Sequence, residues 1–102
     1  MLITTSEEVG DPHDLWIRCW VGDELRQDST TADLLFDVPR LIAHLSRTTT
    51  LETGDVILTG TPSGVGSGMT PPGYLQDGDV VRCEIERLGM LENRVVASEP
   101  TR

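Results

Sequence analysis

The chain has 102 residues and a mass of 11.2 kDa, which allows at most one domain with a modest core. Its formal net charge of −9 argues against a nucleic-acid-binding surface, because such a surface needs clustered Lys and Arg. No apolar stretch reaches the length of a membrane span and no secretory leader is visible, so we expect a cytoplasmic protein.

The first regular element is a strand over residues 15–21, where aliphatic and larger side chains alternate with a period of two. Gly22 and Asp23 then predict a tight turn, so the chain should return as a hairpin through Leu25. On the second face of the strand lie Trp16 and Trp20, which favour core or interface packing over a ligand cage.

A helical region should follow the hairpin. Thr30 or Thr31 is a suitable N-cap for a short turn through Phe36, and Asp37 is a suitable cap for a second helix. That helix should end near Arg47, since three threonines follow. Helical spacing predicts an apolar stripe that packs on the sheet, made of Leu41, Ile42 and Leu45.

A glycine-rich loop is the most informative segment of the chain. Residues 56–58 predict a short strand, which runs into Thr-Gly-Thr-Pro-Ser-Gly-Val-Gly at 59–66. Consecutive exposed amides and hydroxyls of this kind can receive a carboxylate or phosphate oxygen. Nucleotide binding is disfavoured, because the sequence has no lysine for a phosphate loop and Pro71 and Pro72 prevent a helix from following.

The frame Leu-x-x-Gly-Asp-Val occurs twice, at residues 51–56 and 75–80. We therefore expect two turns of one type, each braced by its own side chain, Asp55 or Asp79. The second turn should start a strand over 80–88 that reverses at Gly89 into a last strand over 90–97, before a frayed tail at 98–102.

The remaining reactive side chains have ordinary interpretations. Cys19 and Cys83 are too few for a disulfide framework and lack Cys-x-x-Cys spacing, so we expect two buried small hydrophobic residues. Glu84 and Glu86 share one strand face and could hold a divalent cation, although a solvated pair is the favoured reading. Neither histidine has a partner at ligand spacing, which predicts surface positions for His13 and His44.

Three motifs in order resemble the fumarylacetoacetate hydrolase family. Residues 54–66 match its Gly-Asp-Val-Ile-Leu-Thr-Gly-Thr-Pro-x-Gly-Val-Gly signature, residues 26–39 resemble the segment before it, and residues 78–86 resemble its closing strands. The resemblance covers essentially the whole chain. It implies an α+β, mainly β fold, the C-terminal part of a mixed β-sandwich or roll with one short helical region, forming a single partial domain over 1–102.

The resemblance also implies a site. Gly60, Thr61 and Pro62 would bind the carboxylate or keto-acid end of a substrate. Full members use Mg²⁺ or Mn²⁺, whose Glu-x-Glu and Asp ligands belong to a segment upstream of anything in this sequence, as does the usual catalytic lysine. We therefore expect no catalytic residue and no metal site within the chain itself, and a C-terminal fragment or a reading frame opened at an internal Met.

Two functions from different classes remain open. The first is the C-terminal fragment of a metal-dependent family enzyme that acts on small keto acids or dicarboxylates as a C–C bond hydrolase, an isomerase or a decarboxylase, and that is inactive alone. The second is a non-catalytic β-rich module that dimerises or docks on a missing N-terminal half, because half a fold leaves strand edges and apolar area uncovered. Both leave the identity of the keto acid open.

Overall fold

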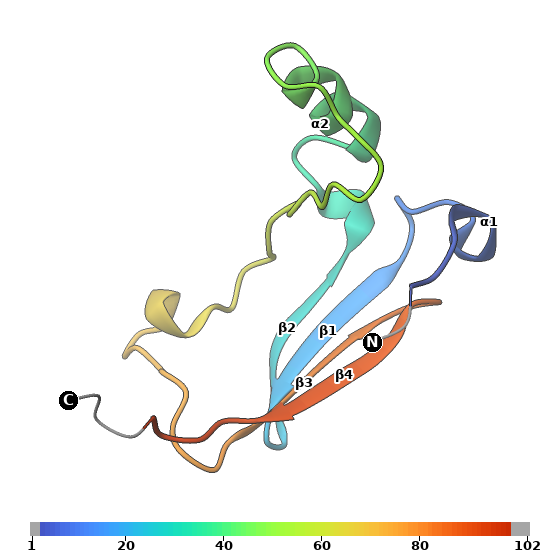
Figure 1. The fold of residues 1–102 in the computed structure, drawn as a ribbon. Helices are drawn as coiled ribbons and strands as arrows, with labels where there is room; N and C mark the ends of the chain where they lie inside the picture. Colours follow the sequence, from blue (N-terminus) through green and yellow to red (C-terminus); the bar gives the residue numbers. More distant parts are fainter. Residues whose placement is uncertain (1–2, 99–102) are drawn as a thin grey trace.

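The computed structural model describes residues 3–98, and its centre is one antiparallel sheet (Figure 1). The four strands are β1 (Trp16–Val21), β2 (Glu24–Thr30), β3 (Val80–Ile85) and β4 (Gly89–Arg94), in the spatial order β2-β1-β3-β4. The mainly β class is therefore confirmed, and so is the hairpin at Gly22 and Asp23. The predicted frayed tail lies, apart from Ser98, outside the described residues.

The two faces of the sheet differ in chemistry. On one face the guanidinium of Arg18 lies 4.9 Å from the ring of Trp16, and that of Arg82 lies 4.4 Å from the ring of Trp20. Arg18 Nε also pairs with Asp28 Oδ1 at 3.0 Å. Within the described residues the tryptophans therefore lie half-buried under arginines rather than in a core, while the alternative of interface packing stays a prediction.

The opposite face is aliphatic along the middle strands. Ile17 pairs with Ile85 and Val21 with Val81 across β1 and β3, and the side chains at these positions point to the same side. No second sheet covers this face among residues 3–98. It is the surface that a sandwich of two layers would bury.

Helix α2 (Val38–Leu45) begins as predicted, because the Asp37 carboxylate accepts a hydrogen bond of 2.9 Å from Arg40 N. It ends two residues before the predicted Arg47. The predicted turn after Thr30 is a single 3-10 turn, η1 (Thr31–Asp33), and it does not reach Phe36. In the same way, η2 (Gly66–Gly68) is a short turn within the glycine-rich loop.

An additional helix, α1 (Ser6–Val9), was not predicted from the sequence. Its signal is a capping box: Thr5 Oγ1 accepts from Glu8 N at 3.3 Å, and the Glu8 carboxylate accepts from Thr5 N at 3.4 Å. Such a pair of reciprocal bonds can start a helix too short to show apolar periodicity.

The strand predicted over residues 56–58 is wrong. This segment is irregular, with Val56 84% and Leu58 93% exposed, because no neighbouring strand offers its edge to the segment's backbone. The turns around it are as predicted: Asp55 Oδ2 accepts from Glu52 N and Asp79 Oδ2 from Gln76 N, both at 2.8 Å.

The last hairpin also differs from its prediction. Strand β3 ends at Ile85 and the chain reverses over residues 86–88, where Arg87 adopts a φ of 67°, so Gly89 starts β4 instead of forming the reversal. Strand β4 ends at Arg94, three residues before the predicted Ala97. Only the reversal itself was predictable, since a non-glycine residue at positive φ is uncommon.

Burial is sparse throughout the described part of the chain. Leu15 is the one buried residue there, 3% exposed, and Thr31 bonds to both its N–H and its C=O. The accessible surface is 8543 Å² and the radius of gyration 16.3 Å. A compact protein of this mass would expose about 5,700 Å² and have a radius of about 13 Å. The fold is therefore open, with α2 and the glycine-rich loop extending away from the sheet (Figure 1).

Candidate functional site

The glycine-rich loop exposes the three residues predicted to bind substrate. Gly60 and Thr61 are exposed and Pro62 is half-buried. Gly60 has a φ of 101°, a conformation that L-residues rarely adopt, and an added Cβ there would meet nothing within 4 Å. Within residues 3–98 the amides of Gly60 and Thr61 make no hydrogen bond, so both can donate to a ligand oxygen.

Gln27 on β2 holds this loop, a contact that sequence reasoning missed. Its Nε2 donates to Thr61 Oγ1 at 2.8 Å and to the Pro62 carbonyl at 2.9 Å. Because a carbonyl can only accept, the amide nitrogen must face Pro62, and Thr61 Oγ1 then accepts from the same group. The hydroxyl proton of Thr61 is thereby left free to donate to a ligand.

Arg26 holds the second half of the loop. Its Nη1 donates to the Gly73 carbonyl at 2.7 Å, and its Nε pairs with Glu24 Oε1 at 2.8 Å. Strand β2 has a β-bulge at this point: Cys19 pairs with Gln27 and Trp20 with Leu25, so Arg26 is the extra residue between them. The bulge explains why the Arg26 side chain reaches the loop. Gly64 packs against the Arg26 carbonyl so closely that a Cβ would collide with it.

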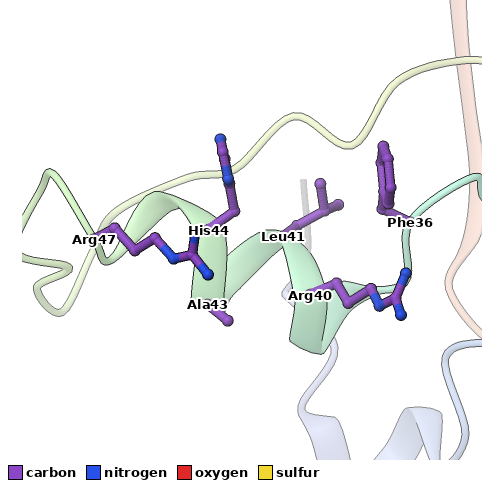
Figure 2. Close-up of a pocket in the computed structure, with 6 residues that line it drawn as sticks. All are labelled: Phe36, Arg40, Leu41, Ala43, His44 and Arg47. Carbon is purple, nitrogen blue, oxygen red and sulfur yellow. The ribbon is translucent and has the colours of Figure 1, made fainter.

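A hollow lies on α2, apart from the glycine-rich loop. Its volume is about 390 Å³, and Figure 2 shows Phe36, Leu41 and His44 on the same side of the helix. Arg40 and Arg47 complete its rim, together with Ala43. The predicted surface position of His44 is confirmed, whereas Leu41, Ile42 and Leu45 do not pack on the sheet.

The other histidine has a structural role. His13 is half-buried, and its Nε2 accepts a hydrogen bond from Val38 N at 3.2 Å, while Nδ1 lies 3.4 Å from Asp11 Oδ1. The prediction of a surface histidine is therefore wrong for His13: the ring supplies an acceptor to a free N–H in the first turn of α2.

The carboxylate pair Glu84 and Glu86 does not form a cation site with other side chains, and only Glu84 lies on β3. Glu86 Oε1 accepts from Trp16 N at 3.2 Å, and Glu84 lies opposite Arg18 in the register of β1 and β3. Across the described positions 3–98, no three His, Cys, Asp or Glu side chains converge. Mg²⁺ and Mn²⁺ need near-octahedral oxygen ligands, so the residues present do not fit such an ion.

We predict a flat calorimetric trace when the chain is titrated with manganese in moderate salt. Separate surface carboxylates give only weak accumulation of cations, because their fields are damped beyond a Debye length of about 8 to 10 Å. A saturable one-to-one isotherm in the micromolar range that disappears in Glu84→Gln would contradict this prediction.

The two cysteines lie side by side, although they are 64 positions apart in the chain. Cys83 is exposed and Cys19 half-buried, so the prediction that both are buried is wrong. Their sulfurs share a hydrogen bond of 3.4 Å. The pKa of Cys19 is raised to about 11, first by burial and then by the hydrogen bond with Cys83 and its charge, while Arg26 lowers it.

Comparison with known proteins identifies the family of this chain. Residues 1–96 match the model described as fumarylacetoacetate (FAA) hydrolase C-terminal. Over 94 residues the chain is 50% identical to the mitochondrial oxaloacetate tautomerase fahd2 of Xenopus laevis, covering 92% of this chain and 30% of that protein. The chain belongs to the fumarylacetoacetate hydrolase family, and it spans about a third of the length of the relatives it matches.

Solved structures agree with this assignment. Fumarylacetoacetate hydrolase from Exiguobacterium antarcticum is 50% identical, with a TM-score of 0.87 over 92% of this chain and 34% of that one. Maleylpyruvate hydrolase from Sphingobium sp. SYK-6, described in complex with manganese(II) and pyruvate, is 44% identical, with a TM-score of 0.83 over 92% of this chain and 33% of that one. The family thus includes an enzyme that holds a divalent metal and a keto acid.

No helix among residues 3–98 is both long and apolar enough to cross a membrane.

Proposed function

We propose that this chain supplies the carboxylate-binding side of a keto-acid site in a fumarylacetoacetate hydrolase-type enzyme. The main observation that supports this proposal is the hydrogen bond from Gln27 Nε2 to Thr61 Oγ1, 2.8 Å long. In this bond Thr61 Oγ1 accepts, so the hydroxyl proton stays free to donate to a ligand, next to the free amides of Gly60 and Thr61. Donors held in place before the ligand arrives lose little entropy when it binds.

The comparisons support a keto acid as the ligand class. Oxaloacetate, named for the Xenopus relative, and pyruvate, named in the Sphingobium structure, both carry a carboxylate beside a carbonyl. Such a group can accept several hydrogen bonds, and a metal cation can stabilise its negative charge. Residues 59–66 include no carboxylate, histidine or cysteine, so the metal ligands and any acid or base would come from residues outside this chain, which alone should be inactive.

A chimera tests this proposal. The matching C-terminal segment of the Xenopus oxaloacetate tautomerase is replaced by this chain, and turnover of oxaloacetate is measured for the chimera and for the isolated chain. We expect turnover in the chimera and none in the isolated chain, because only the chimera combines the loop with the rest of the family fold.

Thr61→Val in the chimera should reduce kcat/KM roughly ten- to a hundredfold, the cost of one hydrogen bond to a charged group. The matched control is Thr59→Val, which removes the hydroxyl of another exposed threonine, two residues earlier, that makes no hydrogen bond within the described structure. A folded chimera without turnover, or equal kcat/KM in the two variants, would refute the proposal.

A second function is favoured by a different observation, the excess of exposed surface. The chain exposes 8543 Å², which is roughly 2,800 Å² more than a compact protein of its mass. A stable interface buries about 1,600 Å² in total, so the excess is large enough for one. We propose that the isolated chain associates through the aliphatic face of its sheet.

A further inference from the structure

We propose that Cys19 and Cys83 form a reversible disulfide between β1 and β3 by exchange with a small disulfide such as oxidised glutathione. The two residues are direct partners in the register of the strands. Their sulfurs lie 3.4 Å apart as thiols, and the sequence contains no third cysteine that could compete.

The hydrogen-bond ladder defines the kind of pair that the cysteines form. Glu86 N donates to the Trp16 carbonyl at 3.0 Å, and Gly22 N donates to the Val80 carbonyl at 2.8 Å. Both bonds join directly opposed residues. Trp16 lies three positions before Cys19 in the chain and Gly22 three positions after it. Since bonded and non-bonded pairs alternate in an antiparallel ladder, Cys19 and Cys83 form a non-hydrogen-bonded pair, whose Cα atoms are about 4.5 Å apart.

This separation permits a disulfide. Disulfides span Cα separations of about 4.4 to 6.8 Å, so the pair lies within that range. Exposed disulfides are typically labile rather than structural, and Cys83 is exposed. Reversibility is therefore part of the proposal.

Exposure determines the order of the two exchange steps. The thiolate of Cys83, the exposed residue, attacks one sulfur of oxidised glutathione, whose S–S bond breaks and releases one glutathione thiolate. The thiolate of Cys19 then attacks Cys83 Sγ and releases the second glutathione. The protein thiols lose two electrons and two protons, and both are recovered in two molecules of reduced glutathione.

The second step should be the slower one. Burial and its neighbour raise the pKa of Cys19 to about 11, so its thiolate is scarce at neutral pH. The short distance to Cys83 compensates, because the reaction is intramolecular. A mixed disulfide of Cys83 with glutathione should therefore accumulate first and then decay.

The bond would affect the candidate site, since Cys19 also pairs with Gln27 across β1 and β2. It joins the two ends of the segment from 19 to 83, which contains β2, α2 and the loop at Thr61. Closing so long a segment restricts the unfolded chain strongly. The oxidised chain should unfold at a higher urea concentration than the reduced one.

The test compares two thiols placed directly opposite each other with two thiols placed two residues out of register. Reduced chain at low micromolar concentration is mixed with oxidised glutathione, and intact mass and peptide mapping follow the products. The native chain should lose two hydrogens, yield a peptide joining Cys19 to Cys83, and regain its mass in dithiothreitol. The matched control is the double variant Val81→Cys with Cys83→Val, which moves the thiol two residues along the same face.

The shifted variant should close at least about tenfold more slowly and remain bound to glutathione, because its thiol lies diagonally across the strands. The chain length between the thiols is almost unchanged, so a disordered chain would not distinguish the two proteins. The native chain unfolded in urea should also close more slowly than the folded native chain. This comparison remains valid even if the shifted variant does not fold. Equal closure rates in any of these pairs, or a native chain that stays glutathionylated, would overturn the proposal.

Discussion

At tens of micromolar, the isolated chain is expected to sediment as a dimer or a larger species rather than as an 11.2 kDa monomer. The reason is the missing core: Leu15, the one buried residue among positions 3–98, cannot offset the entropy of ordering the chain, whereas covering the aliphatic face removes apolar area from water. Analytical ultracentrifugation over a concentration series measures the effect.

Two neighbouring residues on β4 provide a matched pair of variants. Leu91 is 55% and Met90 54% exposed, but they lie on opposite faces. Leu91 pairs with Cys83 on the aliphatic face, whereas Met90 pairs with Glu84 on the face of the arginines and tryptophans. Leu91→Glu should shift the species to monomer, because it buries a charge in the interface, and Met90→Glu should leave it associated.

Monomeric wild-type chain at every concentration would rule out self-association through this sheet. Loss of association in both variants would place the interface elsewhere. The disulfide experiment remains informative in either case, because it is performed at low micromolar concentration and compares proteins with the same exposed surface.

The second large effect is expected from Gly64→Ala, compared with Gly60→Ala. Both residues have positive φ, 109° and 101°, so both substitutions carry similar backbone strain. They differ in space: a methyl at position 64 would collide with the Arg26 carbonyl, whereas one at position 60 meets nothing within 4 Å. Only Gly64→Ala should push the loop away from β2.

Amide hydrogen exchange at Gly73 reports this detachment, because its N–H donates to the Gly66 carbonyl at 2.9 Å inside the same loop. Overpacking of about 2 kcal/mol would accelerate exchange at this amide roughly thirtyfold in Gly64→Ala relative to Gly60→Ala. Equal protection in the two variants would mean that Gly64 does not pack on β2.

Local chemistry explains which elements were predictable. The hairpin at Gly22 and the two aspartate-braced turns depend on residues at most three positions apart, and all were predicted correctly. The cap of α2 by Asp37 is of the same kind. The glycine-rich signature also depends on a continuous stretch of sequence, and together with the motifs at 26–39 and 78–86 it indicated the family that the comparisons then showed.

Errors arose where a segment depends on distant partners. Residues 56–58 have strand-forming side chains, yet they form no strand, since no neighbouring edge is available. His13 has no sequence signal for its bond to Val38 N, 25 positions away. The loop anchor is similar: Gln27 and Thr61 are 34 positions apart, and only the bulge and the course of the loop bring them together.

The sequence by itself therefore determined the local elements, the acidic surface, the family signature and the identity of the exposed loop. Only the tertiary structure decided that Cys19 lies opposite Cys83, that Gln27 bonds to Thr61, and that no second sheet of the described residues covers the aliphatic face. The physical reason is register: a shift of one residue between β1 and β3 would turn every side chain to the other face, and nothing within either strand alone specifies that alignment.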